Sequence, residues 1–412
     1  MKKSLLFALL ISVFTLTNVH SQSGWFPQYS PTTADLNDIV MLDDNTGWIA
    51  GENGTILKTT SGGTNWEQKI SGTTYGLNSF GRIINNTVWV AGDNGMLLKS
   101  TDGGNYWLPK NSGTNVNINE IHFENINTGW IAGDEGMIKK TTNGGNNWIT
   151  QNSEIYILNS IHFVDDNTGW AVGEDGTVLK TTDSGYNWFF QIVGFYVALH
   201  KIRANNPFNG LIAGNDGKIF KTTNGGTNWN PKPSGTLNNL RALVLVNLYL
   251  HWIMGMNGII LHSTDGGESW NSQNSGTTKD LNSGFFSNPL CGWAVGKEGT
   301  ILKTTNGGVS FIHSYNTEIP SEYSLHQNFP NPFNPSTKIR FDIPKTAYVK
   351  LTVFDILGKE IITLVNEKLS AGRYEVEWSA SSVDGSNHPS GLYFYKLITD
   401  KFIAVKKMVL LK

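Results

Sequence analysis

Residues 167–188 read NTGWAVGEDGTVLKTTDSGYNW, and seven copies of this stretch follow one another along the chain. The other six copies occupy residues 45–66, 86–107, 127–148, 208–229, 249–270 and 290–311. Their closing aromatic residues are separated by 41, 41, 40, 41, 41 and 41 positions. A constant period of about 40 residues, with several short strands per unit, is typical of a β-propeller. The repeat therefore predicts a ring of similar blades.

Each unit predicts short strands separated by tight turns. Around the quoted copy, we expect Leu158–Phe163 to be the first strand, Gly169–Gly173 the second and residues 177–181 the third. Asp-Gly and Asn-Gly pairs between the second and third strands supply the positive φ that tight hairpins require. Helical periodicity is nearly absent, so the chain is predicted to be all-β.

The turn after the third strand resembles the Asp-box, Ser/Thr-x-Asp-x-Gly-x-x-Trp, of sialidases, xyloglucanases and related propellers. The match is clearest at Asp102, Asp183 and Asp265, followed by Trp107, Trp188 and Trp270. We interpret these residues as structural: the carboxylate accepts N–H bonds of the turn, and the ring fills the gap between sheets. Burying each ring should contribute roughly 1.5–3 kcal/mol.

As a whole, the unit resembles the repeat of the photosystem II assembly and stability factor family. The resemblance covers about residues 25–311 and implies a seven-bladed propeller. It implies no photosystem role, because the predicted propeller has only three arginines with which to form the family's arginine patch, Arg82, Arg203 and Arg241. We expect the strand at residues 25–29 to complete the seventh blade, and the strand at Phe311 is the competing candidate.

Composition excludes some classes of partner. The 412 residues include 16% charged residues and carry a net charge of −2, so a general nucleic-acid binder is not expected. Cys291 is the only cysteine, which excludes an intrachain disulfide. No phosphate-binding loop or metal-ligand spacing is present, and we predict no cofactor and no metal. The mature protein is expected to be a monomer.

The N-terminus has the pattern of a secretory signal peptide. Two lysines follow Met1, an apolar run extends from Leu5 to Leu16, and small polar residues follow up to Ser21. We therefore predict a signal peptide over residues 1–21 and a propeller over residues 22–312. The apolar run is too short to span a membrane comfortably, so the mature protein is predicted to have no transmembrane span.

Ligand residues are predicted where the copies disagree. The second position of the first strand reads Asn37, Asn78, Asn119, Asn159, His200, Arg241 and Asn282 around the ring. His200 and Arg241 could hold a carboxylate or a sugar, with Asn159 and Asn282 beside them and Tyr156 and Tyr196 in nearby loops. The alternatives are a repeated backbone hydrogen bond for the asparagines, divergent repeats for His200 and Arg241, and packing for the tyrosines.

Catalytic residues are not apparent. A sialidase needs three arginines that converge on a carboxylate, but Arg82 and Arg203 occur deeper in their strands than Arg241 and at unequal depths. Carboxylates are so common in the turns that no glycosidase pair can be singled out. The prediction is a non-enzymatic binding or scaffold propeller for a protein or glycan ligand, and the alternative is an Asp-box glycoside hydrolase.

The repeat stops after Phe311, and the sequence changes character. Residues 313–321 are interpreted as a linker, and residues 322–412 as a small Ig-like β-sandwich, because apolar residues alternate at Val349, Leu351 and Val353. This segment contains Asn-Pro-Phe-Asn-Pro-Ser at residues 331–336 and ends in a basic, apolar strand.

The same segment resembles the C-terminal sorting domain of the type IX secretion system of Bacteroidota. The resemblance implies recognition by the outer-membrane secretion machinery after passage through the periplasm, and a secreted or surface-attached product. It ties sorting to the Asn-Pro-Phe-Asn-Pro-Ser segment and to the terminal lysines Lys406, Lys407 and Lys412.

Overall fold

The computed structural model describes residues 24–151, 156–308, 312–316, 319–380 and 388–411. The predicted signal peptide and Lys412 lie outside these residues. The chain forms two compact units that adjoin in the sequence between residues 311 and 312. Among the described residues, no helix has the length and apolar character needed to cross a membrane.

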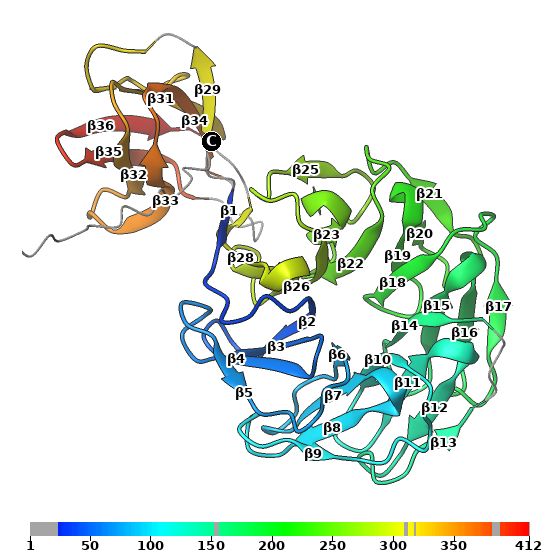
Figure 1. Cartoon of the computed structure of the whole chain (residues 1–412). Helices are drawn as coiled ribbons and strands as arrows, with labels where there is room; N and C mark the ends of the chain where they lie inside the picture. The colour runs from blue at the N-terminus through cyan, green and yellow to red at the C-terminus, as the bar shows by residue number, and fades with distance from the viewer. Residues whose placement is uncertain (1–23, 152–155, 309–311, 317–318, 381–387, 412) are drawn as a thin grey trace, which may run out of the picture. The chain divides into compact units, whose positions relative to one another are not determined.

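The first unit is a propeller of seven four-stranded antiparallel sheets within the described residues (Figure 1). The first strand of each blade lines the central channel: β2 (Leu36–Met41), β6 (Leu77–Phe80), β10 (Ile118–Phe123), β14 (Leu158–Phe163), β18 (Leu199–Ala204), β22 (Leu240–Leu245) and β26 (Leu281–Phe286). The second strands are β3 (Gly47–Gly51), β7 (Val88–Gly92), β11 (Gly129–Gly133), β15 (Gly169–Gly173), β19 (Gly210–Gly214), β23 (His251–Gly255) and β27 (Gly292–Gly296).

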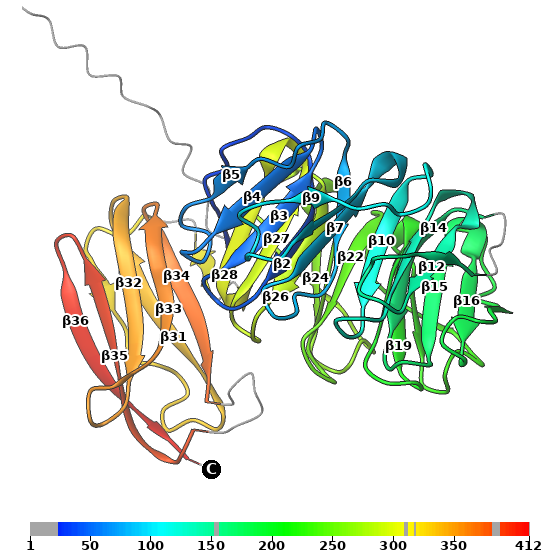
Figure 2. The same cartoon turned by 90° about the horizontal axis from the view of Figure 1, so that it is seen from below.

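The third and fourth strands complete each blade, and Figure 2 shows the blades from the side. The third strands are β4 (Thr55–Thr59), β8 (Leu97–Ser100), β12 (Ile138–Thr141), β16 (Val178–Thr181), β20 (Ile219–Thr222), β24 (Ile260–Ser263) and β28 (Ile301–Gly308). The outer strands are β5 (Glu67–Lys69), β9 (Leu108–Pro109), β13 (Ile149–Thr150), β17 (Phe189–Gln191), β21 (Asn230–Lys232), β25 (Asn271–Gln273) and β1 (Gly24–Pro27). Blades are numbered 1 to 7 from β2 to β26.

Short polar turns join the second and third strands, as the Asp-Gly and Asn-Gly pairs predict. In blades 2 to 7 the turn is a single 3₁₀ turn: η1 (Asp93–Gly95), η2 (Asp134–Gly136), η3 (Glu174–Gly176), η4 (Asn215–Gly217), η5 (Met256–Gly258) and η6 (Lys297–Gly299). The middle residue has positive φ even where it is Glu135 (57°) or Glu298 (54°). The second strands that these turns follow are buried along their whole length.

The strand β1 closes the ring, which confirms that the strand containing Trp25 completes the seventh blade, and the competing candidate Phe311 lies outside the described residues. β1 pairs antiparallel with β28, with Phe26 opposite Lys303. Trp25 is 1% exposed, its Nε1 donates to Gln273 Oε1 at 3.0 Å, and its ring packs edge-on against Phe286. Closure by the chain's own first strand leaves no blade incomplete.

A contact between a lysine, a tryptophan and a glycine joins neighbouring blades. Lys58 of β4 lies over the ring of Trp48 at 5.6 Å and donates to the carbonyl of Gly103, in the Asp-box of the next blade, at 2.7 Å. Gly104 packs so closely on the same tryptophan that a Cβ would lie 2.0 Å from Trp48 Nε1. Other blade pairs repeat the lysine contact with the third-strand lysines Lys99, Lys180 and Lys303.

The second unit contains two four-stranded sheets. One has the order β29 (Ile312–Asn316), β34 (Gly372–Ser379), β31 (Ser336–Ile343), β30 (Ser324–Leu325). The other has the order β33 (Glu360–Leu369), β32 (Ala347–Phe354), β35 (Gly391–Thr399), β36 (Ile403–Leu410). Strand β29 lies where the start of the linker was predicted. Its backbone pairs with β34 and extends that sheet, so these residues belong to the second unit.

The blade-joining contact predicts a difference between two adjacent glycines. Both Gly103→Ala and Gly104→Ala should lose roughly 1–2 kcal/mol, because both residues have positive φ, 71° and 78°. Gly104→Ala should lose a further 1–3 kcal/mol or so, because its Cβ overlaps Trp48, whereas the Cβ of Gly103→Ala meets nothing within 4 Å. Thermal unfolding of the full chain measures both losses. Equal melting temperatures for the two variants would contradict the proposed contact.

Two buried histidines of blade 6 are expected to make the protein less stable in mild acid. Burial lowers the pKa of His251 and the pKa of His262 to about 4. The unfolded chain therefore binds more protons between about pH 6.5 and 4, so the free energy of unfolding falls as the pH drops through this window. Other blades have glycine or valine in place of His251 and lysine in place of His262. The variant H251G/H262K should show a shallower fall in melting temperature over this range, and an unchanged slope would refute the assignment.

Candidate functional site

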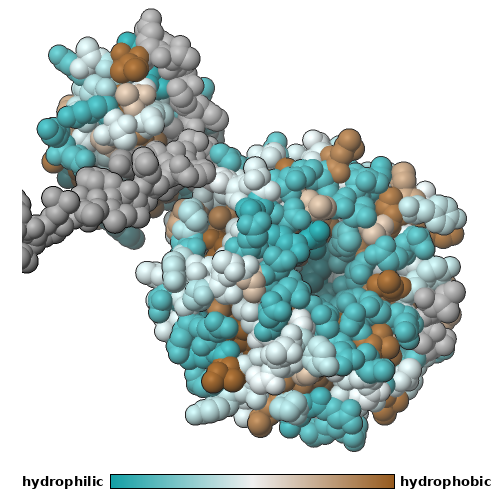
Figure 3. All heavy atoms as spheres, viewed as in Figure 1, coloured by the Kyte–Doolittle hydropathy of each residue, from teal (hydrophilic) through white to brown (hydrophobic). Residues whose placement is uncertain are grey.

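The central channel collects most of the chemically distinctive side chains of the propeller. Figure 3 shows it as a hollow surrounded by hydrophilic residues on one face of the ring. Positions two, three and five of the inner strands supply three tiers of residues. The upper tier is Asn37, Asn78, Asn119, Asn159, His200, Arg241 and Asn282. The middle tier is Asp38, Ser79, Glu120, Ser160, Lys201, Ala242 and Ser283, and the lower tier is Val40, Gly81, His122, His162, Arg203, Val244 and Phe285.

The upper-tier asparagines hold neighbouring blades together. Asn159 Nδ2 donates to the carbonyl of Leu199 in the next blade and to Glu174 Oε1, each at 3.0 Å. Asn282 Nδ2 donates to the carbonyl of Leu36 at 2.9 Å across the point of ring closure. The backbone bond recurs at the other three asparagines of this tier. The side-chain N–H groups of these asparagines are therefore used in hydrogen bonds that close the ring, and fewer of their polar atoms remain for a ligand in the channel.

His200 and Arg241 lie in adjacent blades of the same tier. The Nε2 atom of His200 lies 2.6 Å from Asn215 Oδ1, and burial lowers the pKa of His200. Arg241 Nη1 donates to Asn282 Oδ1 at 2.6 Å, and its Nη2 lies 3.7 Å from an oxygen of Asp280. The structure thus brings His200, Arg241 and Asn282 into one tier, with part of their hydrogen-bonding capacity already used inside the ring.

The two candidate tyrosines lie outside the channel cavity described below. Tyr156 packs edge-on against Phe190 of β17, with ring centroids 6.4 Å apart. Tyr196 is 93% exposed on the loop that follows β17. Neither side chain lines that cavity. His200, Arg241, Asn159 and Asn282 are also absent from the lining of that cavity, so the predicted ligand residues form no part of it.

The middle tier links blades through a second repeated hydrogen bond. The side-chain oxygen of each acceptor residue receives an N–H from the next inner strand: Asp38 from Phe80 (2.7 Å), Ser79 from Ile121 (3.5 Å), Glu120 from Ile161 (2.9 Å) and Ser160 from Ile202 (3.2 Å). Lysine and alanine cannot accept such a bond, so the series is interrupted at Lys201 and Ala242 in blades 5 and 6.

Glu120 anchors an ion cluster that crosses the channel. Its Oε1 accepts from Lys201 Nζ and from Arg203 Nη2, both at 2.8 Å, although these residues belong to a strand two blades away. Burial alone would raise the pKa of Glu120, but Arg203 and Lys201 outweigh this effect and hold the pKa well below its usual value. Burial raises the pKa of Asp38, and Lys201 offsets part of that rise.

A cavity of about 520 Å³ lies at the middle and lower tiers. Its lining includes the basic and histidine side chains of Arg82, His122, His162 and Arg203. It also includes the apolar side chains of Val40, Val244, Leu245 and Phe285. The rings of His122 and His162 meet edge-on with centroids 5.2 Å apart. Burial lowers the pKa of His162 well below its usual value, and its Nε2 lies 3.1 Å from the carbonyl of Ala204. His162 is therefore neutral near pH 7.

The sequence pattern does not predict that Arg82 and Arg203 share a site, and it does not single out His122 and His162. The signal was available, because His122, His162 and Arg203 occupy the fifth position of three successive inner strands. A bulge after the first position turns residues three and five toward the channel together with residue two. A strict alternation of faces would not reveal this arrangement.

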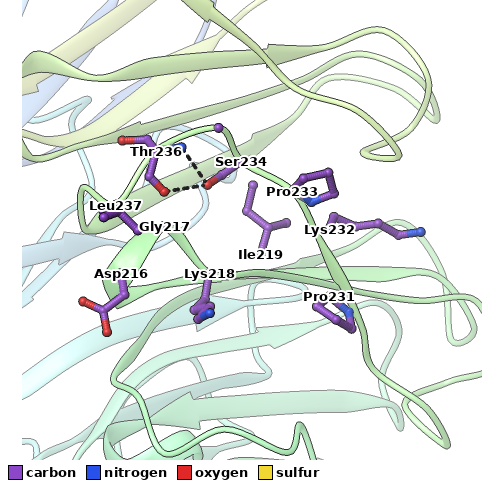
Figure 4. A pocket seen from close by; sticks show the side chains of 11 residues that line it. Asp216, Gly217, Lys218, Ile219, Pro231, Lys232, Pro233, Ser234, Thr236 and Leu237 are labelled. Carbon is purple, nitrogen blue, oxygen red and sulfur yellow. Dashed lines mark hydrogen bonds between the residues drawn. The ribbon is translucent and has the colours of Figure 1, made fainter.

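Another cavity, of about 540 Å³, lies at the outer part of blade 5 (Figure 4). It is bounded by the η4 turn and β21, with Pro231, Pro233 and Leu237 among its lining residues. Figure 4 shows Ser234 bonded within its own loop to Thr236, with Oγ to carbonyl at 3.1 Å. The cavity brings no buried charged groups together, so the channel is the stronger candidate.

The Asp-box residues lie in the turns after the third strands. Asp102 Oδ1 accepts from the N–H groups of Asn105 and Tyr106 at 3.0 and 3.1 Å and from Ser100 Oγ. Asp183 and Asp265 make the corresponding turn bonds. Trp107, Trp188 and Trp270 are at most 9% exposed. Among the residues with described positions, no group of three or more His, Cys, Asp or Glu side chains could hold a metal ion.

The two sequence elements assigned to sorting contact each other in the second unit. The N–H of Phe333 donates to the carbonyl of Val409 at 3.0 Å, and the N–H of Val409 donates to Asn331 Oδ1 at 2.9 Å. Lys406 and Lys407 lie on β36 opposite Tyr395 and Phe394 of β35, and Lys407 is exposed. The Asn-Pro-Phe-Asn-Pro-Ser segment and the last strand therefore form one continuous surface.

Comparison with known proteins agrees with this geometry. The family model described as photosynthesis system II assembly factor YCF48 matches residues 17–109, 105–193 and 191–279, and the model described as secretion system C-terminal sorting domain matches residues 327–411. No curated protein matches the sequence.

Solved structures resemble the propeller. The structure titled "YCF48 bound to D1 peptide" is 22% identical, covers 69% of this chain and 96% of its own, and has a TM-score of 0.60. YCF48 from Cyanidioschyzon merolae is 19% identical, with coverages of 68% and 98% and a TM-score of 0.59. The GH74 enzyme of Niastella koreensis is 18% identical, with coverages of 67% and 43% and a TM-score of 0.54. These identities establish the fold alone.

The family match extends over more than half of the chain, and it spans blades 1 to 6 together with β1, the outer strand of blade 7. This protein therefore belongs to the photosynthesis system II assembly factor YCF48 family and carries a C-terminal sorting domain for secretion.

Proposed function

We propose that this exported propeller is a binding protein whose ligand occupies the lower part of the central channel. The sorting domain supports secretion or attachment to the cell surface through the type IX system. The observation that carries the binding proposal is the cavity of about 520 Å³, which combines an apolar wall with cationic and histidine side chains. Cavities of this size and mixed character are typical of ligand sites.

A glycosidase is the weaker alternative. Hydrolysis of a glycosidic bond requires two carboxyl groups that can reach the substrate. The carboxylates that line the cavity are Asp38 and Glu120, and both oxygens of each accept hydrogen bonds within the ring. The likeness to a GH74 enzyme concerns the fold. The solved YCF48 with its bound peptide favours binding over hydrolysis, although its ligand is a property of that protein.

A retention screen of the full chain against peptides and glycans tests the proposal, with assays for product release in parallel. Val244→Trp should abolish retention because the larger ring fills the cavity that Val244 lines. Leu237→Trp places the same ring at a position that is 85% exposed and should change nothing. Loss of retention in H200A/R241A but not in V244W would instead locate the ligand at the upper tier. Turnover of a glycan would refute the binding-only function.

If the lysines of β36 take part in sorting, their removal should impair export of the protein. K406Q/K407Q removes two charges from β36 but keeps Met408 and Leu410, which are buried (0% and 1% exposed). If the secretion machinery reads this strand, most of the variant should remain in the periplasm. K396Q/K401Q removes two charges from the neighbouring strand β35 and its hairpin and is the matched control. Cell fractionation with surface labelling measures the outcome, and equal surface display of both variants would contradict the role of the lysines.

A further inference from the structure

The middle tier carries more charge than ring closure needs. Ser79 and Ser160 make the hydrogen bond to the next blade with a neutral hydroxyl. Asp38, which is half-buried, and Glu120, which is buried, make the same bond with carboxylates, and burial of a charge costs free energy unless partners compensate it. Because serine suffices for closure, the charges of this tier point to another role.

Every oxygen of the cavity carboxylates already accepts at least one hydrogen bond within the ring. Asp38 accepts from Ser283 Oγ at 2.6 Å on one oxygen and from the N–H of Phe80 at 2.7 Å on the other. Glu120 accepts from Lys201 and Arg203 on Oε1 and from the N–H of Ile161 on Oε2. The hydrogen-bonding capacity that the cavity can offer a ligand is therefore mainly that of donors.

The donors contact one segment of the chain. Arg203 bonds to Glu120 of β10, and the Nη1 atom of the exposed Arg82 lies 3.4 Å from the carbonyl of Glu124, so the two guanidinium groups contact residues on either side of His122 in the sequence. Each guanidinium has five N–H donors and uses few of them in these contacts. Three cations, Arg82, Lys201 and Arg203, face two lining carboxylates, which leaves one positive charge even when both are ionised. Glu124 is not part of the lining, and its Oε2 lies 3.5 Å from His122.

The remaining wall is apolar and comes from the opposite arc of the ring. Val40 of β2, Val244 and Leu245 of β22, and Phe285 of β26 line this side. A ligand that fills about 520 Å³ would place one end against donors and the other against hydrocarbon. A guanidinium group pairs with a carboxylate through two parallel hydrogen bonds, and an organic acid supplies such a carboxylate.

We infer that the channel cavity binds a small organic carboxylate with an apolar body. The carboxylate lies against Arg82 and Arg203 beside His122, and the apolar body packs on Val40, Val244 and Phe285. This inference rests on the proposed function, since it names the ligand class of the same cavity.

Calorimetric titration of the full chain with 4-phenylbutyrate, its amide and acetate tests the inference. The amide keeps the apolar body and removes the charge, while acetate keeps the charge and removes the body. Phenylbutyrate should bind at least about tenfold more tightly than either, because a charge-assisted pair and apolar burial each contribute. Equal affinity of the acid and the amide would overturn the inference.

Variants separate this site from the upper tier. Arg82→Gln should weaken phenylbutyrate binding by about tenfold or more, because it removes one charged partner of the carboxylate. Arg82 makes one long backbone contact in the described part of the chain, so the fold should persist, and thermal unfolding verifies this. Lys110→Gln, which removes one exposed positive charge outside the cavity, is the matched control and should leave binding unchanged. If Arg82→Gln leaves the affinity intact, the assignment is wrong.

The failure of this inference can be told apart from failure of the proposed function. If phenylbutyrate does not bind but Val244→Trp still abolishes retention of a partner found in the screen, the channel is the ligand site and only the carboxylate assignment is refuted. If Val244→Trp has no effect on retention and no carboxylate binds, both are refuted. Binding of phenylbutyrate that Val244→Trp and Arg82→Gln both abolish supports the two together.

Discussion

The propeller depends on the contact in which a third-strand lysine crosses from one blade to the next. Lys180, for example, lies 4.9 Å from the centre of the Trp170 ring and donates to the carbonyl of Gly225 at 2.7 Å. Burial lowers the pKa of this lysine, but a charged ammonium is retained by the ring and the carbonyl. The contact joins one blade's core to the Asp-box of the next, so the Asp-box is part of the interface between blades.

The contact changes in the same blades where the channel changes. Blade 5 has Leu211 in place of the tryptophan, and blade 6 has His262 in place of the lysine, stacked on Trp252 at 4.3 Å. These two blades also supply Lys201 and Ala242, which interrupt the middle-tier hydrogen bonds. Because a blade packs mainly against its two neighbours, a local departure can be absorbed without loss of the ring. Blades 5 and 6 thereby gain side chains that serve the channel.

The two units place different demands on their sequences. In the propeller, the residues that close the ring repeat from blade to blade, whereas the lower tier of the channel differs in most blades. In the C-terminal unit, the Asn-Pro-Phe-Asn-Pro-Ser segment is held against the last strand by Asn331, Phe333 and Val409. Elements 70 or more residues apart in the sequence are therefore held together in the folded sorting domain.

The sequence by itself determined the seven blades and the turn chemistry, because these follow from a period and from Asn-Gly and Asp-Gly pairs. It left two candidates for closure of the ring, and the pairing of β1 with β28 decided for the strand that contains Trp25. Only the tertiary structure decided where the candidate site lies. His200 and Arg241 were predictable as departures from the repeat, but neither lines the channel cavity, and neither do Asn159, Asn282, Tyr156 and Tyr196. The cluster of Glu120 with Lys201 and Arg203 joins strands 81 to 83 residues apart, and a linear pattern does not encode such a contact across a channel.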